Sequence, residues 1–177
     1  MIPSPYCTIG PYFPNEFADA WSDLTRHDGK EARGERIVLT GRVLEEGGIP
    51  TINTILEIWQ PDTNGIFRSE LDPRRAEADP GFFGWGRART DKDGRYRFTT
   101  ILPGGIGRAP HANLMILAIG LTRRLTTTVF FSDAPDPVLN CVPPEARKRL
   151  IAVREADGVY RFDIVLRGEN ETPFFLD

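Results

Sequence analysis

The pattern of apolar and polar positions changes near residue 35. Before this point, proline and glycine interrupt the chain at Pro3, Pro5, Gly10, Pro11 and Pro14, which favours irregular backbone. After it, β-branched residues and alternating apolar positions dominate. We therefore expect an extended N-terminal arm over residues 1–35, with room for one short helix near residues 16–24. A single folded unit should follow over residues 36–177.

Six segments have the alternation or the apolar run expected of β-strands, and turn-forming residues separate them. They are Arg36–Leu44, Thr54–Gln60, Arg95–Leu102, Asn113–Gly120, Leu125–Phe131 and Val159–Arg167. Their number, spacing and turn chemistry predict an all-β protein, built as a β-sandwich or a partly open barrel.

Two segments depart from the β pattern. Leu71–Gly86 is rich in proline, glycine and aromatic residues, so we predict a long loop. Pro143–Ala156 begins with proline, contains good helix formers and has apolar residues at Leu150, Ile151 and Val153, which predicts a helix. The folded unit should therefore carry one or two short helices.

Composition narrows the class of protein. The chain has 177 residues, of which 40% are apolar and 27% charged, and its net charge is −3. These values suit one soluble globular domain and give no reason to expect a nucleic-acid partner. No apolar run reaches about 18 residues, which argues against a transmembrane helix. The first ten residues lack the basic and apolar stretches of a secretion signal, so we expect a cytoplasmic protein.

Metal-binding residue types are scarce. The sequence contains two cysteines, Cys7 and Cys141, two histidines, His27 and His111, and four tyrosines. The cysteines do not have zinc-motif spacing, and we expect two small buried apolar side chains. The histidines form no HxH, HxxxH or ExxH pair, although a catalytic metal site usually needs at least three converging ligands. Taken alone, these residues argue against a metalloenzyme.

Four segments, taken in order, resemble the intradiol ring-cleavage dioxygenases. They are Glu57–Asp62 with Asn64-Gly65, Phe83–Arg87 with Thr90-Asp91 and Gly94, Phe98–Gly104, and Arg108–His111. The resemblance spans residues 5–177 and implies an oxidoreductase with a prealbumin-like β-sandwich core. Within the family, the chain is most similar to the α-type subunits of protocatechuate-cleaving enzymes, on the segments Thr8–Tyr12, Pro110–Asn113 and Gly168–Phe175.

This resemblance implies a division of labour between two chains. A homologous β-type subunit would hold non-haem Fe(III) and cleave a small aromatic diol with O₂. With protocatechuate, the product would be 3-carboxy-cis,cis-muconate, which feeds the β-ketoadipate route of aromatic breakdown. The present chain would be the non-catalytic α subunit of this hetero-oligomer, and would shape the active site and shield it from solvent.

The family's iron ligands are two tyrosines and two histidines, and each can be carried over to one position of this chain. The tyrosines fall at Phe67 and Ile106, and the histidines fall at His111 and Asn113. A phenyl ring or an aliphatic side chain has no lone pair to donate to Fe(III). We therefore expect neither metal nor cofactor in this chain, and a structural role for His111.

The resemblance assigns part of the partner's substrate pocket to the N-terminal arm. In the family's α subunits this arm approaches the iron site of the partner. Thr8, Gly10, Pro11 and Tyr12 would accordingly lie at the rim of the shared active site. The simpler interpretation, in which the arm only fills space at the subunit interface, remains open at this point.

A second contribution to that pocket concerns Ile119, which stands where the family's α subunits usually carry an arginine close to the substrate. Isoleucine cannot pair with an anionic ring substituent as a guanidinium does. Arg123 and Arg124 follow four and five residues later and are the nearest cations along the chain that could compensate. The resemblance therefore implies the reaction class and leaves the natural catechol open.

Other interpretations also fit parts of the sequence. The chain could be the α-type subunit of a related intradiol dioxygenase that acts on another substituted catechol. It could be a non-enzymatic interaction module, because Gly41–Pro50 and Asp93–Phe98 also resemble segments of prealbumin-like and adhesin domains. A stand-alone enzyme is the third alternative, and the missing ligands argue against it.

Overall fold

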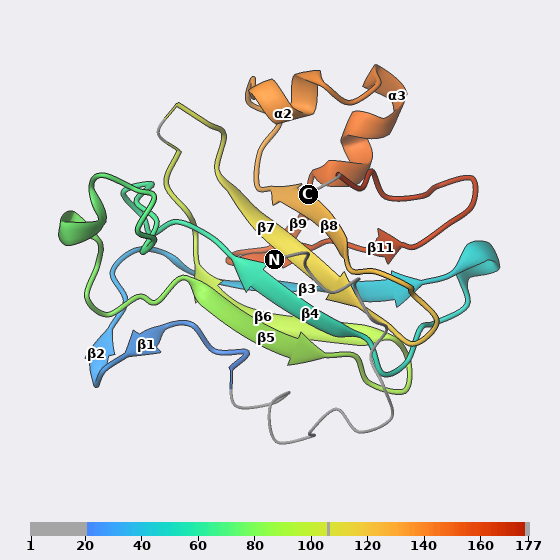
Figure 1. Ribbon diagram of the computed structural model, residues 1–177, viewed down its shortest axis with the longest axis horizontal. Helices are drawn as coiled ribbons and strands as arrows, with labels where there is room; N and C mark the ends of the chain where they lie inside the picture. The colour runs from blue at the N-terminus through green and yellow to red at the C-terminus, as the bar shows by residue number, and fades with distance from the viewer. Residues whose placement is uncertain (1–20, 106, 176–177) are drawn as a thin grey trace, which may run out of the picture.

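Two β-sheets make up most of the computed structural model, which describes residues 21–105 and 107–175 (Figure 1). The first sheet is antiparallel throughout, and its strands lie in the order β5, β4, β7, β8. Their bounds are Trp85–Arg89 for β5, Ile55–Trp59 for β4, His111–Leu117 for β7 and Leu125–Phe130 for β8.

The second sheet is built on β3 (Arg36–Leu44), the longest described strand. One edge of β3 pairs antiparallel with β6 (Arg95–Ile101). The other edge pairs in parallel with β10 (Val159–Arg161) along its middle and with β11 (Ile164–Val165) near its end. β9 (Val153–Ala156) extends this sheet by pairing with β10.

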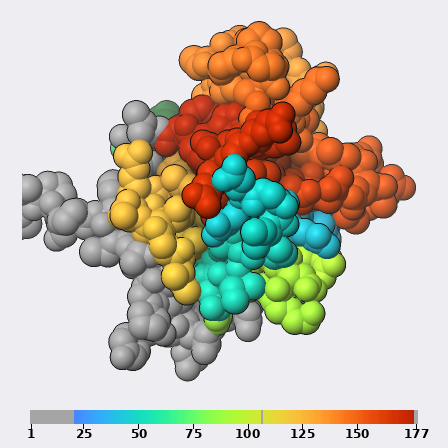
Figure 2. Space-filling model, turned by 90° about the vertical axis from the view of Figure 1, so that its right-hand side faces the viewer, coloured from blue at the N-terminus to red at the C-terminus, as the bar shows by residue number. Residues whose placement is uncertain are grey.

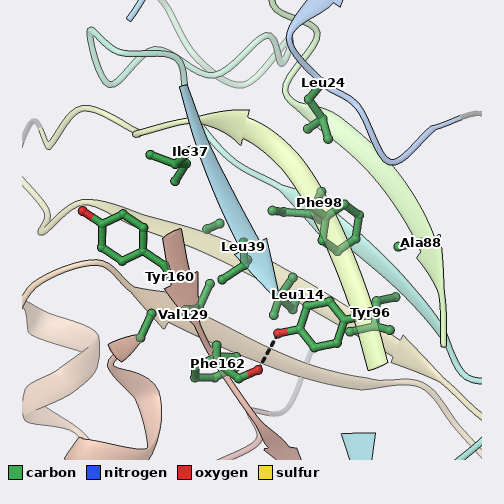
Figure 3. Packing of buried hydrophobic residues seen from close by; sticks show 14 of the residues in the cluster. Leu24, Ile37, Leu39, Ala88, Tyr96, Phe98, Leu114, Val129, Tyr160 and Phe162 are labelled. Atoms are coloured by element: carbon green, nitrogen blue, oxygen red, sulfur yellow. Dashed lines mark hydrogen bonds between the residues drawn. The ribbon is translucent and has the colours of Figure 1, made fainter. Parts of the chain in front are cut away.

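The hydrophobic core lies between the two sheets (Figure 3). Strand residues alternate between the faces of a sheet, and the inward positions are apolar on both sides. The second sheet contributes Ile37, Leu39, Tyr96 and Phe98, and the first contributes Leu56, Ile58, Leu114 and Ile116. Each fully buried aliphatic side chain of this kind contributes about 1.5–3 kcal/mol to folding.

The phenol of Tyr96 is a polar group inside this core. Its hydroxyl donates a hydrogen bond of 2.6 Å to the carbonyl oxygen of Phe162 (Figure 3). Burial, together with the charge of Asp163, raises the pKa of Tyr96 well above its ordinary value of 10.0. The hydroxyl therefore stays protonated and keeps donating this bond, which joins β6 to the segment between β10 and β11.

Short elements complete the fold. The hairpin of β1 (Arg26–His27) and β2 (Lys30–Glu31) lies apart from the large sheets. Two short α-helices, α2 (Pro137–Asn140) and α3 (Pro144–Arg147), follow β8 and pack over a second apolar cluster that includes Phe130 and Leu150. Among residues 21–105 and 107–175, 3-10 turns cover the ranges Glu46–Gly48 (η1), Arg75–Glu77 (η2) and Lys148–Leu150 (η3).

The prediction of an all-β protein with one or two short helices is confirmed for the described residues. All six expected strand segments contain strands, but Val159–Arg167 forms two, because Phe162 and Asp163 interrupt it between β10 and β11. The sequence analysis missed β5, whose first two residues it placed at the end of a loop. Glycine at position 86 hides the alternation there, and the close approach of Trp21 and Leu24 excludes a larger residue.

Two other expectations were wrong. The helix expected over Pro143–Ala156 ends by residue 150, and its last four residues form β9 instead. Those four residues are exposed, so they have no apolar face that would favour a helix packed on the core. Backbone pairing with β10 determines their conformation instead. Cys141, expected to be buried, is exposed at the end of α2. Within the described parts of the chain, none of the helices is long and apolar enough to cross a membrane.

Candidate functional site

Neighbouring ends of β4 and β7 place Trp59 and Asn113 next to each other. The two residues are directly paired, and Trp85 of β5 lies on the other side of Trp59. Since Ile58 and Leu114 point into the core, the alternation of side chains turns Trp59 and Asn113 to the outer face of the first sheet.

A hollow of about 500 Å³ opens on this outer face. Its walls come from the ends of the two strands and from the loop that follows β4. The lining residues are Trp59, Phe67, Ser69, Leu71, Asp72, Pro73, Arg74 and Asn113. Phe67 and Asn113, two of the four positions at which the sequence analysis expects the family's iron ligands, therefore line the same hollow.

Buried carboxylates fix the loop that carries Phe67. Asp62 is 1% exposed, and its side chain accepts hydrogen bonds from the backbone N–H groups of Asn64, Ile66 and Asp79 at 2.8, 3.0 and 2.9 Å. The carboxylate of Asp79 in turn accepts from the backbone of Gly81 at 2.9 Å. A buried carboxylate with several N–H donors holds backbone geometry firmly, so this loop is ordered without any ligand.

Asp72 fixes the part of the loop that lines the hollow. Its carboxylate accepts from the backbone N–H of Arg74 at 2.8 Å and of Phe67 at 3.0 Å, and from Nη2 of Arg74 at 3.4 Å. The bond from the Arg74 backbone is the main reason that the pKa of Asp72 lies below its usual 3.8. Asp72 is therefore ionised at neutral pH, and its oxygens are already engaged by the loop.

His111 begins β7 behind this wall. It is 4% exposed, and its ring lies 6.2 Å from that of Phe67 and 5.9 Å from that of Phe130 between centroids. Nδ1 lies 2.8 Å from the carbonyl oxygen of Ala109, and because a carbonyl can only accept, Nδ1 carries the proton. Burial is the main cause of the lowered pKa of His111, so the ring is neutral at pH 7.

An ion pair anchors the segment that leads to His111. Nε of Arg108 donates to the carboxylate of Asp136 at 2.6 Å, and the backbone N–H groups of Ala109 and Val138 donate to the same carboxylate at 3.0 and 2.8 Å. Burial opposes ionisation of Asp136, but these hydrogen bonds outweigh it and lower the pKa. Asp136 also caps α2, so one side chain connects this helix to the start of β7.

Close backbone packing also positions the loop after β6. A Cβ atom on Gly104 would lie 2.2 Å from the carbonyl oxygen of Thr63, so only glycine allows this approach. The N–H of Gly104 donates to the carbonyl oxygen of Asp62 at 2.9 Å. The loop before Ile106 thus packs on the loop that carries Phe67. Ile106 itself lies outside the described residues.

The side chains at this site do not fit the family's ferric centre. Phe67 has no donor atom, and the side-chain oxygen of Asn113 accepts a hydrogen bond of 3.0 Å from Thr128. His111 is the one imidazole there, and within residues 21–105 and 107–175 no three His, Cys, Asp or Glu side chains are grouped to hold a metal ion. The described tyrosines, Tyr96 and Tyr160, are both in the core.

Ile119 lies at the opposite end of β7 from His111. It is 58% exposed and belongs to the turn between β7 and β8, as do Arg123 and Arg124. Figure 2 shows this turn (yellow) at the surface beside the loop that follows β3 (cyan). Eight residues of extended chain span roughly 26 Å, so Ile119 does not line the hollow beside Phe67.

The remaining expected pocket residues, Thr8, Gly10, Pro11 and Tyr12, lie outside the described residues, as does Cys7. Sequence analysis missed the contribution of Asp72 and Arg74 to the hollow, because it treated their segment as an unassigned loop. Serine at position 69 and the Asp72-Pro73 pair are turn signals that predict an ordered loop. They do not predict which side chains face the hollow.

Comparisons with known proteins identify the family. Residues 8–168 match the profile of a family described as dioxygenase. The β chain of protocatechuate 3,4-dioxygenase from Burkholderia cepacia is 41% identical over 172 residues, which cover 85% of this chain and 73% of that one. The α chain from the same organism is 35% identical over 192 residues, covering 97% and 96%. The α chain from Pseudomonas putida is also 35% identical, covering 97% and 95%.

Solved structures show the same fold. The dioxygenase domain of a carbohydrate-binding fusion protein from Streptomyces sp. SirexAA-E superposes with a TM-score of 0.61 at 25% identity, covering 97% of this chain and all of that one. 3-Chlorocatechol 1,2-dioxygenase from Rhodococcus opacus 1CP gives a TM-score of 0.60 at 22% identity, covering 92% and 71%. The chain belongs to the intradiol ring-cleaving dioxygenases, a family of oxidoreductases.

Proposed function

We propose that this chain is an iron-free α-type subunit that completes the active site of a β-type partner holding Fe(III). The main support for this proposal is the lack of iron-binding side chains at the expected ligand positions. The positions that correspond to the family's ligands hold Phe67, Ile106, His111 and Asn113, and ferric iron prefers anionic oxygen and imidazole donors. One neutral imidazole cannot replace four ligands, so the metal chemistry belongs to another chain.

Two observations bear on whether the chain is of α or β type. The β chain of B. cepacia is more identical, at 41% against 35%, but the alignment covers only 73% of its length. The α chain aligns over 96% of its length. We give more weight to the ligand positions than to overall identity, because a β-type role requires side chains that bind iron.

In this proposal the two facing sheets form a β-sandwich, and residues 1–35 form an arm that reaches the partner. Thr8, Gly10, Pro11 and Tyr12 contribute to the rim of the shared pocket. The partner would add both atoms of O₂ to a catechol and open the ring between the hydroxyl-bearing carbons. With protocatechuate as the substrate, the product is 3-carboxy-cis,cis-muconate.

Ile119 belongs to the same proposal as a substrate-pocket residue. Its exposed side chain, on a turn that also carries Arg123 and the partly exposed Arg124, is accessible to a partner chain. An isoleucine there favours an uncharged part of the ring, whereas an arginine would pair with a carboxylate. The preference between protocatechuate and uncharged catechols therefore reports on this position.

The test is to express the chain with and without the β-type partner and to assay ring cleavage. We expect cleavage only in the co-expressed complex, and Ile119→Arg should shift the preference of the complex toward protocatechuate over catechol. Cleavage by the isolated chain would contradict the proposal. A stable monomer that binds no related chain would favour the interaction-module alternative.

A further inference from the structure

Three adjoining hollows follow β3 on the outer side of the second sheet. Their volumes are about 370, 370 and 420 Å³. The first and second share Thr40 and Arg95 as lining residues, and the second and third share Leu44. Because Leu39 and Val43 belong to the core, the alternate positions of β3 face outward and line these hollows. We call this surface the β3 furrow.

The first half of the β3 furrow is basic. Arg42 of β3 and Arg95 of β6 are directly opposite each other, and Arg97 is opposite Thr40. Like charges in directly opposite positions destabilise a sheet. Arg95 is paired with Asp93 at 2.7 Å, but the exposed side chains of Arg42 and Arg97 have no hydrogen bond or ion pair among the described residues. Two guanidinium groups are therefore available to an acidic surface.

The carboxylates that line this basic half are already engaged. Glu155 and Asp163 both pair with Arg161, at 2.6 and 2.7 Å. The carboxylate of Asp91 accepts hydrogen bonds from the backbone N–H groups of residues 93 and 95, each at 2.8 Å. These contacts leave Arg42 without a carboxylate of its own, although Asp163 also accepts from its backbone N–H at 3.0 Å.

The other half of the β3 furrow is acidic. Glu45, Glu46 and Glu169 line the third hollow together with Arg167. Figure 2 shows the loop after β3 (cyan) next to the C-terminal segment (red) that supplies the last two. Arg167 lies 3.9 Å from Glu45 and 4.0 Å from Glu46, at the limit of an ion pair. Glu169 has no ion pair within residues 21–105 and 107–175. Three carboxylates against one guanidinium leave a net negative charge.

We propose that the β3 furrow is a contact surface between two copies of this chain. A two-fold contact requires a surface that is complementary to itself, and adjacent halves of opposite charge meet this requirement. A two-fold axis near Leu44 places the basic half of each copy on the acidic half of the other. The half-buried Leu44 side chains, which lie where the two halves join, then meet at the centre.

This inference goes beyond the proposed function, because it concerns a second copy of the same chain. The hollow beside Phe67 opens on the outer face of the first sheet, and the core separates that face from the β3 furrow. A contact through the furrow therefore leaves the candidate site free for a β-type partner. Two copies joined in this way would link two such pairs of chains.

The experiment is sedimentation velocity on the purified full-length chain over a range of protein concentrations. We expect a monomer–dimer equilibrium at low salt. The dissociation constant should rise at least about tenfold between 0.1 M and 1 M salt, because the screening length falls from about 10 Å to about 3 Å.

Reversing charges in the basic half tests which surface is used. Arg42→Glu combined with Arg97→Glu should raise the dissociation constant at least about tenfold, since both halves of the furrow are then acidic. Lys30→Glu combined with Arg33→Glu makes the same change in net charge at exposed residues that do not line the furrow. This control should dimerise as the unchanged chain does.

A second variant makes the test independent of folding defects. Glu46→Arg combined with Glu169→Arg gives a furrow that is basic in both halves, and this variant should also be monomeric on its own. Mixing it with the variant that carries Arg42→Glu and Arg97→Glu restores opposite charges across both halves of a two-fold contact. We expect the mixture to form a one-to-one dimer.

A chain that stays monomeric at every concentration in low salt would overturn the inference. A dimer that neither salt nor the furrow variants weaken would do the same, as would two folded variants that fail to associate when mixed. None of these results touches the proposed function, which depends on ring cleavage by the co-expressed complex.

Discussion

At the scale of single residues, the proposal that this chain holds no iron rests on the donor atoms of three side chains. Phe67 lacks the oxygen of a tyrosine, and Asn113 offers an amide in place of an imidazole. His111 keeps a hydrogen bond from Nδ1 to a backbone carbonyl, which leaves Nε2 as the unprotonated nitrogen, as in many metal-binding histidines. The missing donor atoms could be predicted from the sequence, because the residue type alone decides whether a side chain has a lone pair. The orientation of the Arg74 side chain could not be predicted, because it depends on hydrogen bonds to Asp72 and Gly65.

Restoring the donors should restore the metal. The combined substitutions Phe67→Tyr, Ile106→Tyr and Asn113→His would add two phenols and one imidazole to His111. We expect the purified variant to bind Fe(III) and to show visible phenolate-to-iron absorption, with Phe67→Tyr alone as a colourless control. A folded triple variant that takes up no iron would mean that the surrounding backbone has also lost the geometry of the site.

The buried ring of His111 predicts a dependence of stability on pH. Its lowered pKa means that the unfolded chain binds a proton first as the pH falls below about 6.5. Stability should therefore fall from that pH downward, until the folded chain is protonated too. The urea midpoint should be lower at about pH 5 than at about pH 7.5, and His111→Asn should reduce the difference. If the difference between the two urea midpoints persisted in His111→Asn and disappeared in His27→Asn, His111 would not be its cause.

At the scale of elements, the local sequence pattern predicted the strands that have a regularly buried face. β3 was predicted with its observed bounds because its inward positions are regularly apolar. β5 was missed because Gly86 and Ala88 are small, and β9 was taken for a helix because its residues have no buried face. β5 forms through pairing with β4, about 25 residues earlier in the chain, and such pairing is not visible in a local pattern. β9 pairs with β10 across the turn Asp157-Gly158, a hairpin signal that the helix prediction overlooked.

The connection between α2 and β7 gives a test at this scale. Asp136→Ala would leave two backbone N–H groups and the partly exposed Arg108 without their acceptor. We expect a loss of about 1–3 kcal/mol in the free energy of unfolding, measured by urea denaturation. Asp133→Ala, three residues earlier and exposed, should change stability by less than about 0.5 kcal/mol. Similar losses for both variants would show that the ion pair does not hold these elements together.

At the scale of the whole molecule, the chain has a dioxygenase fold with a hollow lined by Phe67 and Asn113, two positions at which the sequence analysis expects the family's metal ligands. The family could be predicted from the order of four sequence segments, and the comparisons confirm it. The oligomeric assembly could not be predicted, because it depends on contacts with the surface of a second chain. The proposed function requires that a different chain holds the metal.

Iron stoichiometry tests this claim most directly. The complex of this chain with its β-type partner should be purified, and its iron and protein content measured together with the visible absorption of each chain alone. We predict one ferric ion for each pair of chains, and no iron or phenolate absorption in this chain on its own. Two ions for each pair, or iron and colour in the isolated chain, would contradict the account.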